Sequence, residues 1–108
     1  MGLDWLDVVW RLEKRFGFKW DRKVAQEFAF ERMNEEGRRF RGTVGFAIDA
    51  CQHVLSVQQE DPNWSGPRWT REQIAQGVKE DLIAVLDLSQ TPSELDESLD
   101  LQKDLGMD

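Results

Sequence analysis

The apolar residues near the start of the chain recur with the period of an amphipathic helix. One face of that helix would carry Trp5, Val8, Val9, Leu12 and Phe16. Leu3, Leu6 and Trp10 widen this apolar face, and Gly17 is a natural helix stop. The pattern predicts a helix over residues 3–16 that neighbouring helices cover from two sides, at the centre of a bundle.

Three later segments carry the same helical signals, with an N-capping side chain before each of them. The expected caps are Asp21, Thr43 and Thr70, and Thr70 also forms a capping box with Gln73. The predicted helices cover residues 22–36, 43–55 and 71–87. Neither the alternating pattern of a strand nor an internal repeat occurs, so the sequence predicts an all-α bundle.

The segments between and after these helices are of two kinds. Residues 56–69 contain two prolines and a glycine without periodicity, so they are expected to form a linker whose tryptophans pack on the bundle. Residues 88–108 have irregularly spaced leucines and predict a structured loop with short turns. Gly77 interrupts the last helix and suggests a close helix contact. With 108 residues, the chain is expected to form one domain, 1–108, around a single core.

Composition limits the expected cellular location of the protein and the classes of partner that it binds. The net charge is −7, and no apolar run approaches the ~18 residues of a membrane span. Asp4 and Asp7 stand where a signal peptide would be basic, so we expect a cytoplasmic protein without a membrane span. Basic residues dominate from Arg11 to Arg41, but interspersed acids and the lack of a recognition motif argue against a nucleic-acid partner.

The sequence offers little catalytic or metal-binding chemistry. Cys51 is the only cysteine and His53 the only histidine, so we expect no metal site. Cys51 lies on an apolar helix stripe and is expected to be a buried, unreactive thiol, whereas His53 lies off the stripe, at the surface. No nucleophile–base pair or phosphate-binding loop is visible, so no catalytic residue is assigned and the protein is not expected to be an enzyme.

Four segments resemble parts of the acyl carrier protein family. The run LDESLDLQKDLGMD at residues 95–108 is similar to the loop that precedes the phosphopantetheine attachment site of that family. The run LDWLDVVWRLEKRFG at residues 3–17 is similar to the helix that follows the site. TVGFAIDACQHVL at residues 43–55 resembles the last family helix, and residues 70–88 correspond to the first. The resemblance implies an acyl-carrier-like four-helix bundle in circularly permuted order, with family helices II, III, IV and I.

The resemblance also places a split and altered cofactor motif at the two chain ends. In the family an Asp-Ser-Leu motif carries 4′-phosphopantetheine on its serine. Here Asp108, Leu3 and Asp4 match residues of that site, but Gly2 occupies the serine position. Because glycine has no hydroxyl, no phosphopantetheine is expected, and Gly2 is predicted to lie near Asp108. The alternative is a working carrier of fatty-acid or polyketide metabolism whose serine comes from outside this chain.

The family's second helix usually binds partner enzymes through acidic residues. The corresponding candidates here are Leu3, Asp7, Arg11 and Lys14, and their mixed charge favours a dedicated protein partner, such as an acyl- or carrier-handling enzyme. Leu6 and Trp10 are candidates for an acyl pocket, which leaves a small lipid-binding bundle as another alternative. The chain is expected to be a monomer or, because its ends meet at the site, a swapped dimer.

Overall fold

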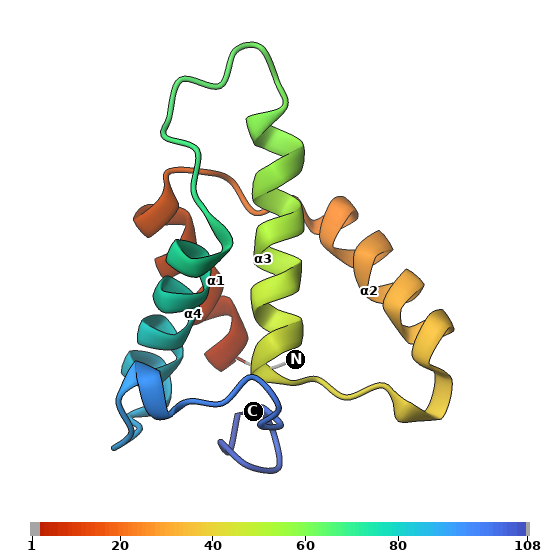
Figure 1. The fold of residues 1–108 in the computed structure, drawn as a ribbon, viewed down its shortest axis with the longest axis vertical. Helices are drawn as coiled ribbons and strands as arrows, with labels where there is room; N and C mark the ends of the chain where they lie inside the picture. The colour runs from red at the N-terminus through yellow and green to blue at the C-terminus, as the bar shows by residue number, and fades with distance from the viewer. Residues whose placement is uncertain (1–2, 108) are drawn as a thin grey trace.

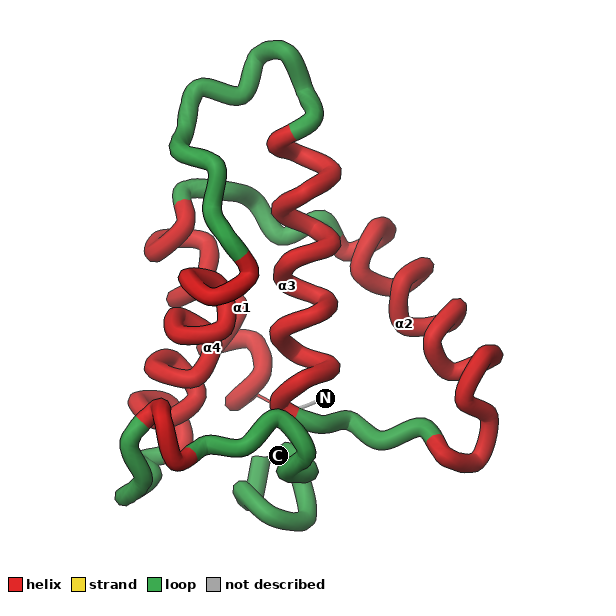
Figure 2. Tube along the Cα trace, in the orientation of Figure 1, coloured by secondary structure: helices red, strands yellow, loops and turns green. Residues whose placement is uncertain are grey.

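Four α-helices account for most of residues 3–107, which are the residues described by the computed structural model (Figures 1 and 2). The α-helices are α1 (Leu3–Phe16), α2 (Arg22–Glu36), α3 (Val44–Gln59) and α4 (Arg71–Leu86). Two short 3-10 helices, η1 (Gly37–Arg39) and η2 (Pro92–Glu94), lie between and after them. The described residues contain no strand, only an isolated bridge between Thr43 and Asp100, so the predicted all-α, four-helix architecture is confirmed.

Side-chain caps set the starts of the later helices. The Asp21 carboxylate accepts hydrogen bonds from the backbone N–H of Lys23 at 3.0 Å and of Val24 at 3.2 Å. The Thr43 hydroxyl accepts one from the backbone N–H of Phe46 at 3.1 Å, and Thr70 forms its capping box. Each cap satisfies N–H groups that have no partner within the helix, so the predicted caps Asp21, Thr43 and Thr70 are confirmed.

The end of the third helix differs from the prediction. It was expected at residue 55, where the apolar stripe stops, but α3 continues to Gln59, which is buried. Residues 56–61 contain no glycine or proline, so nothing in the backbone ends the helix at residue 55. The following connection is therefore residues 60–70 rather than the predicted 56–69 linker.

Helix α3 is the centre of the bundle. It packs against α4 on one side and α2 on the other, and α4 in turn packs against α1 (Figure 1). Seven apolar residues of α3 are buried: Val44, Ala47, Ile48, Ala50, Cys51, Val54 and Leu55. The expectation that the first helix occupies the centre is therefore wrong.

Helix α1 buries a narrower face than the sequence suggested. Val8, Leu12 and Phe16 are buried in the core. Leu3 is 80% exposed, Leu6 54% and Trp10 52%, although these residues were expected to widen the buried face. The reason is geometric, because among the described helices only α4 packs against α1, and it covers the stripe opposite these residues. Helix α2 leans away from the remaining helices (Figure 1).

Helix α2 is held to α3 by side chains at its edge and has no buried residue of its own. The Phe28 ring stacks on both Phe46 and His53 of α3, with centroid distances of 6.0 Å and 5.0 Å. The Arg32 guanidinium donates a hydrogen bond to Asp49 at 3.1 Å. These contacts hold one edge of α2 against α3, while Phe30 on α2 remains 63% exposed.

The segment after α4 is a structured loop, as predicted. Its backbone binds the start of α3, because the carbonyls of Leu99 and Glu97 accept hydrogen bonds from the N–H groups of Val44 and Gly45 at 2.9 Å and 2.8 Å. Within the loop, backbone N–H groups, chiefly that of Lys103, hold the pKa of the Asp100 carboxyl below its usual value. The segment therefore covers the end of the bundle at which α3 begins.

The contact between α1 and α4 combines an ion pair with a close backbone approach. Arg15 donates two hydrogen bonds to the buried Asp81 carboxylate, at 2.9 Å and 3.2 Å. A Cβ atom at Gly77 would lie 2.5 Å from Cζ of Phe16 and 2.6 Å from Cδ of Arg15. The close contact expected at Gly77 is therefore confirmed.

Replacing Gly77 by alanine tests this approach. Alanine is the better helix former by ~1 kcal/mol. We nevertheless expect Gly77→Ala to lower the free energy of unfolding by about 1–3 kcal/mol, because its methyl group overpacks the buried Phe16 ring. Urea unfolding would measure the change, with Gln76→Ala on the exposed side of α4 as the control. A variant more stable than the parent would contradict the interpretation.

Candidate functional site

A recess with a mostly apolar lining lies between α1 and α2, with α3 as its floor. It has a volume of about 510 Å³, within the range of small-molecule pockets. Its apolar lining consists of Trp5, Leu6, Val9, Trp20, Ala25, Ala29, Phe46 and Ala50. Glu13, Arg22 and Gln26 add polar groups. The recess follows from the lean of α2, which separates α2 from α1.

The turn between α1 and α2 holds one wall of this cavity in place. The Glu13 carboxylate accepts a hydrogen bond from the backbone N–H of Trp20 at 2.8 Å. The Trp20 ring meets Trp5 edge to face, with centroids 5.8 Å apart, and contacts the buried Phe18 ring at 6.3 Å. The two indoles are therefore positioned before any ligand arrives.

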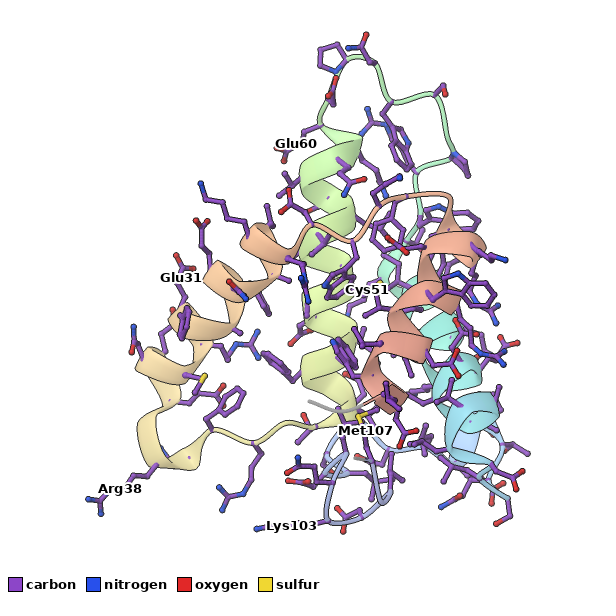
Figure 3. The ribbon with its side chains drawn as sticks, turned by 180° about the vertical axis from the view of Figure 1, so that it is seen from behind. Glu31, Arg38, Cys51, Glu60, Lys103 and Met107 are labelled. Carbon is purple, nitrogen blue, oxygen red and sulfur yellow. The ribbon has the colours of Figure 1, made fainter. Side chains whose placement is uncertain are left out.

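A second, smaller cavity lies where the two ends of the described chain approach each other. Its volume is about 180 Å³, and both Trp5 in the first turns of α1 and Met107 line it. Met107 is 5% exposed and lies at the end of the bundle where α1 and α3 begin (Figure 3). The predicted proximity of Gly2 and Asp108 concerns residues outside the described range.

The outward face of α1, opposite its buried stripe, carries the residues predicted to bind a partner. We define this face as Leu3, Leu6, Asp7, Trp10, Arg11 and Lys14. All six are exposed. The Arg11 guanidinium lies 3.8 Å from the Asp7 carboxylate, and the Lys14 ammonium lies 3.8 Å from the centroid of the Trp10 ring. Asp4 lies in the same first turn of α1 and is partly buried.

The structure separates the two residues of the predicted acyl pocket. Leu6 lines the large cavity, but Trp10 is not among its lining residues. Trp5, Val9 and Trp20 line it instead. The sequence analysis places Trp5 and Val9 on the core-facing side of the first helix and gives Trp20 no role, so it missed their place in a cavity. The available signal was the weak apolar pattern of residues 22–36. The apolar face that it predicts is too narrow to pack against both α1 and α3.

Cys51 and His53 lie where the sequence predicted. The Cys51 thiol is fully buried beneath the surface of α3 (Figure 3), and burial raises its pKa to about 12. His53 is exposed and stacks on Phe28. Among residues 3–107, no group of three histidine, cysteine, aspartate or glutamate side chains is arranged to hold a metal ion.

Burial of Cys51 predicts a thiol that reacts only after unfolding. We expect negligible alkylation by iodoacetamide at pH 8 in the native protein, because both access and thiolate formation are suppressed. Full alkylation is expected in urea. Mass spectrometry of the intact protein would measure both, and rapid alkylation of the native chain would contradict the burial.

No protein-family model matches this chain, and comparisons with the curated proteins and with solved structures likewise returned no match. No helix within residues 3–107 has both the length and the apolar character required to cross a bilayer.

Proposed function

We propose that the chain is an acyl-carrier-like, non-catalytic interaction module whose helices follow the permuted family order II, III, IV and I. One observation carries the proposal. Trp5 near the start of α1 and Met107 near the end of the chain line the same cavity. In a permuted acyl carrier bundle, the loop before the attachment site and the helix after it must adjoin at this place.

Two further contacts support this order. The connection over residues 60–70 joins the end of α3 to the start of α4, and the Trp69 indole N–H donates a hydrogen bond to the Phe16 carbonyl at 3.1 Å. The start of α4 therefore meets the end of α1, so the two helices are antiparallel. The segment over residues 95–107 then returns to the end of the bundle at which α1 and α3 begin, as the family loop would.

The proposed module binds other proteins without carrying a cofactor. Attachment of phosphopantetheine requires a hydroxyl as the phosphoryl acceptor, and Gly2 provides none at the matching position. Ser98 lies in the loop upstream of that position and is exposed in a turn. What remains for recognition is the outward face of α1, whose mixed charges suit a dedicated, acyl- or carrier-handling protein in the cytoplasm.

A mass measurement tests the absence of the cofactor. We expect no gain in mass when the purified protein is incubated with a phosphopantetheinyl transferase and coenzyme A, since the acceptor hydroxyl is lacking. A conventional acyl carrier protein in the same reaction is the positive control. An adduct on Ser98 or any other residue would overturn the non-carrier function.

The cavity between α1 and α2 favours a second function, a small lipid-binding bundle. Its apolar lining and two fixed indoles suit an aliphatic ligand, and the Arg22 side chain lines the same space and could pair with a carboxylate. This function does not require the permuted order, because it depends only on the separation of α2 from α1.

Fluorescence distinguishes this second function. If the cavity binds fatty acids, their addition should shift tryptophan emission saturably, because Trp5 and Trp20 line the site. Val9→Glu should abolish the shift by placing a charge among the apolar lining residues, whereas Val57→Glu on the surface of α3 should not. A flat response of the parent protein would exclude lipid binding in this cavity.

A further inference from the structure

The outward face of α1 combines exposed apolar side chains with ordered charges. Large hydrophobic residues exposed within residues 3–107 are Leu3, Leu6, Trp10, Phe30, Met33 and Val57. Three of these six lie together on this one face. Contiguous apolar residues with a charged rim are typical of interaction sites, whereas single exposed ones are ordinary. We propose that this face binds a second copy of the chain through antiparallel pairing of the two α1 helices.

The charges on the face identify the occupant. Asp7 lies in the N-terminal half of α1, and Arg11 and Lys14 lie in the C-terminal half. An antiparallel copy sets the acidic half of each helix beside the basic half of the other. A parallel copy would set like charges together, and a uniformly acidic or basic partner would match only one half. The face is therefore complementary to itself about a two-fold axis, as an isologous dimer requires.

A pair of helices that cross between the levels of Asp7 and Trp10 brings together both the apolar and the charged residues of the two faces. Leu6 of each copy then meets Trp10 of the other, and Asp7 lies beside Arg11 of the other. Leu3 packs on the aliphatic stem of Lys14, a use of lysine that keeps its ammonium in water. Tryptophan and arginine near the middle of a contact are the side chains that most often dominate binding energy.

The present contacts within α1 leave these groups available. The Asp7 to Arg11 pair is long, at 3.8 Å, and its side chains are 51% and 42% exposed. Lys14 covers one side of the Trp10 ring, which is still 52% exposed. Surface pairs of this kind contribute little within one molecule, so exchanging them for contacts across a dimer costs little.

This dimer differs from a swapped dimer and does not depend on acyl-carrier likeness. Each bundle stays closed, and only the surfaces of α1 meet. Because the proposed protein partner would use the same face, dimer formation and partner binding exclude each other. The dimer is measured on the purified chain alone, so its failure leaves the cofactor measurement and the proposed function unaffected.

Sedimentation velocity over a concentration series of the full chain tests the dimer. The parent protein should show a reversible, concentration-dependent dimer. Trp10→Glu should weaken association at least 10-fold, a loss of ~1.4 kcal/mol. Val57→Glu, which adds the same charge at an exposed apolar site of α3, should associate like the parent. Circular dichroism would establish that both variants keep their helices.

Variants with reversed charges on this face provide the decisive experiment. Asp7→Lys makes the face wholly basic, and the double variant Arg11→Asp, Lys14→Asp makes it wholly acidic. Each should self-associate more weakly than the parent, while an equimolar mixture should form a heterodimer.

Four results would overturn the proposal: a parent protein monomeric at every concentration, a parent that captures a different protein while remaining monomeric, a dimer insensitive to Trp10→Glu, or no preference for the heterodimer in the mixture. A slowly exchanging dimer insensitive to Trp10→Glu would indicate swapping.

Discussion

The bundle depends on the burial of one helix, α3, from both sides. Its apolar residues meet α4 along one flank, and its first turn receives the backbone of the C-terminal segment through the carbonyls of Leu99 and Glu97. Burial of this apolar surface is the largest favourable contribution to the stability of a small domain. Helix α4 packs against α3, and α1 packs against α4 rather than against α3. Helix α2 contacts α3 along one edge and has no buried residue.

This hierarchy explains why the candidate sites lie on α1 and α2. A helix that buries one face in the core exposes the other, and α1 exposes an apolar, charged face rather than a uniformly polar one. The lean of α2 opens a cavity that Glu13 and Trp20 keep in shape. Interaction surfaces of small domains commonly arise in this way, where packing of the core leaves an apolar face without a neighbour.

The acyl-carrier likeness and the proposed dimer rest on observations at different parts of the molecule. The acyl-carrier likeness depends on segments that meet at one end of the bundle, where Trp5 and Met107 line a common cavity. The dimer depends on the exposed apolar residues and the order of charges along α1. A dimer would cover the partner-binding face, so the concentration of the protein would regulate how much of it is free to bind a partner.

Local chemistry in the sequence determined where most helices begin. A hydrogen bond from Asp21, Thr43 or Thr70 to the first turn needs only neighbouring residues, so the starts at residues 22, 44 and 71 could be predicted. Gly77 also indicated a close helix contact, but the sequence did not identify the Phe16 ring as the group in contact. The burial of Cys51 followed from its place on a long apolar stripe.

Tertiary structure alone decided which apolar faces are covered. Helical spacing places Leu3, Leu6 and Trp10 on one face whether or not a neighbour covers them. They are exposed because, among the described helices, only α4 packs against α1, on the opposite face. The cavity shared by Trp5 and Trp20 likewise depends on two segments that approach through the turn at Glu13. Periodicity determines which side chains share a helix face. The packing of helices distant in sequence determines whether that face becomes core, cavity or binding surface.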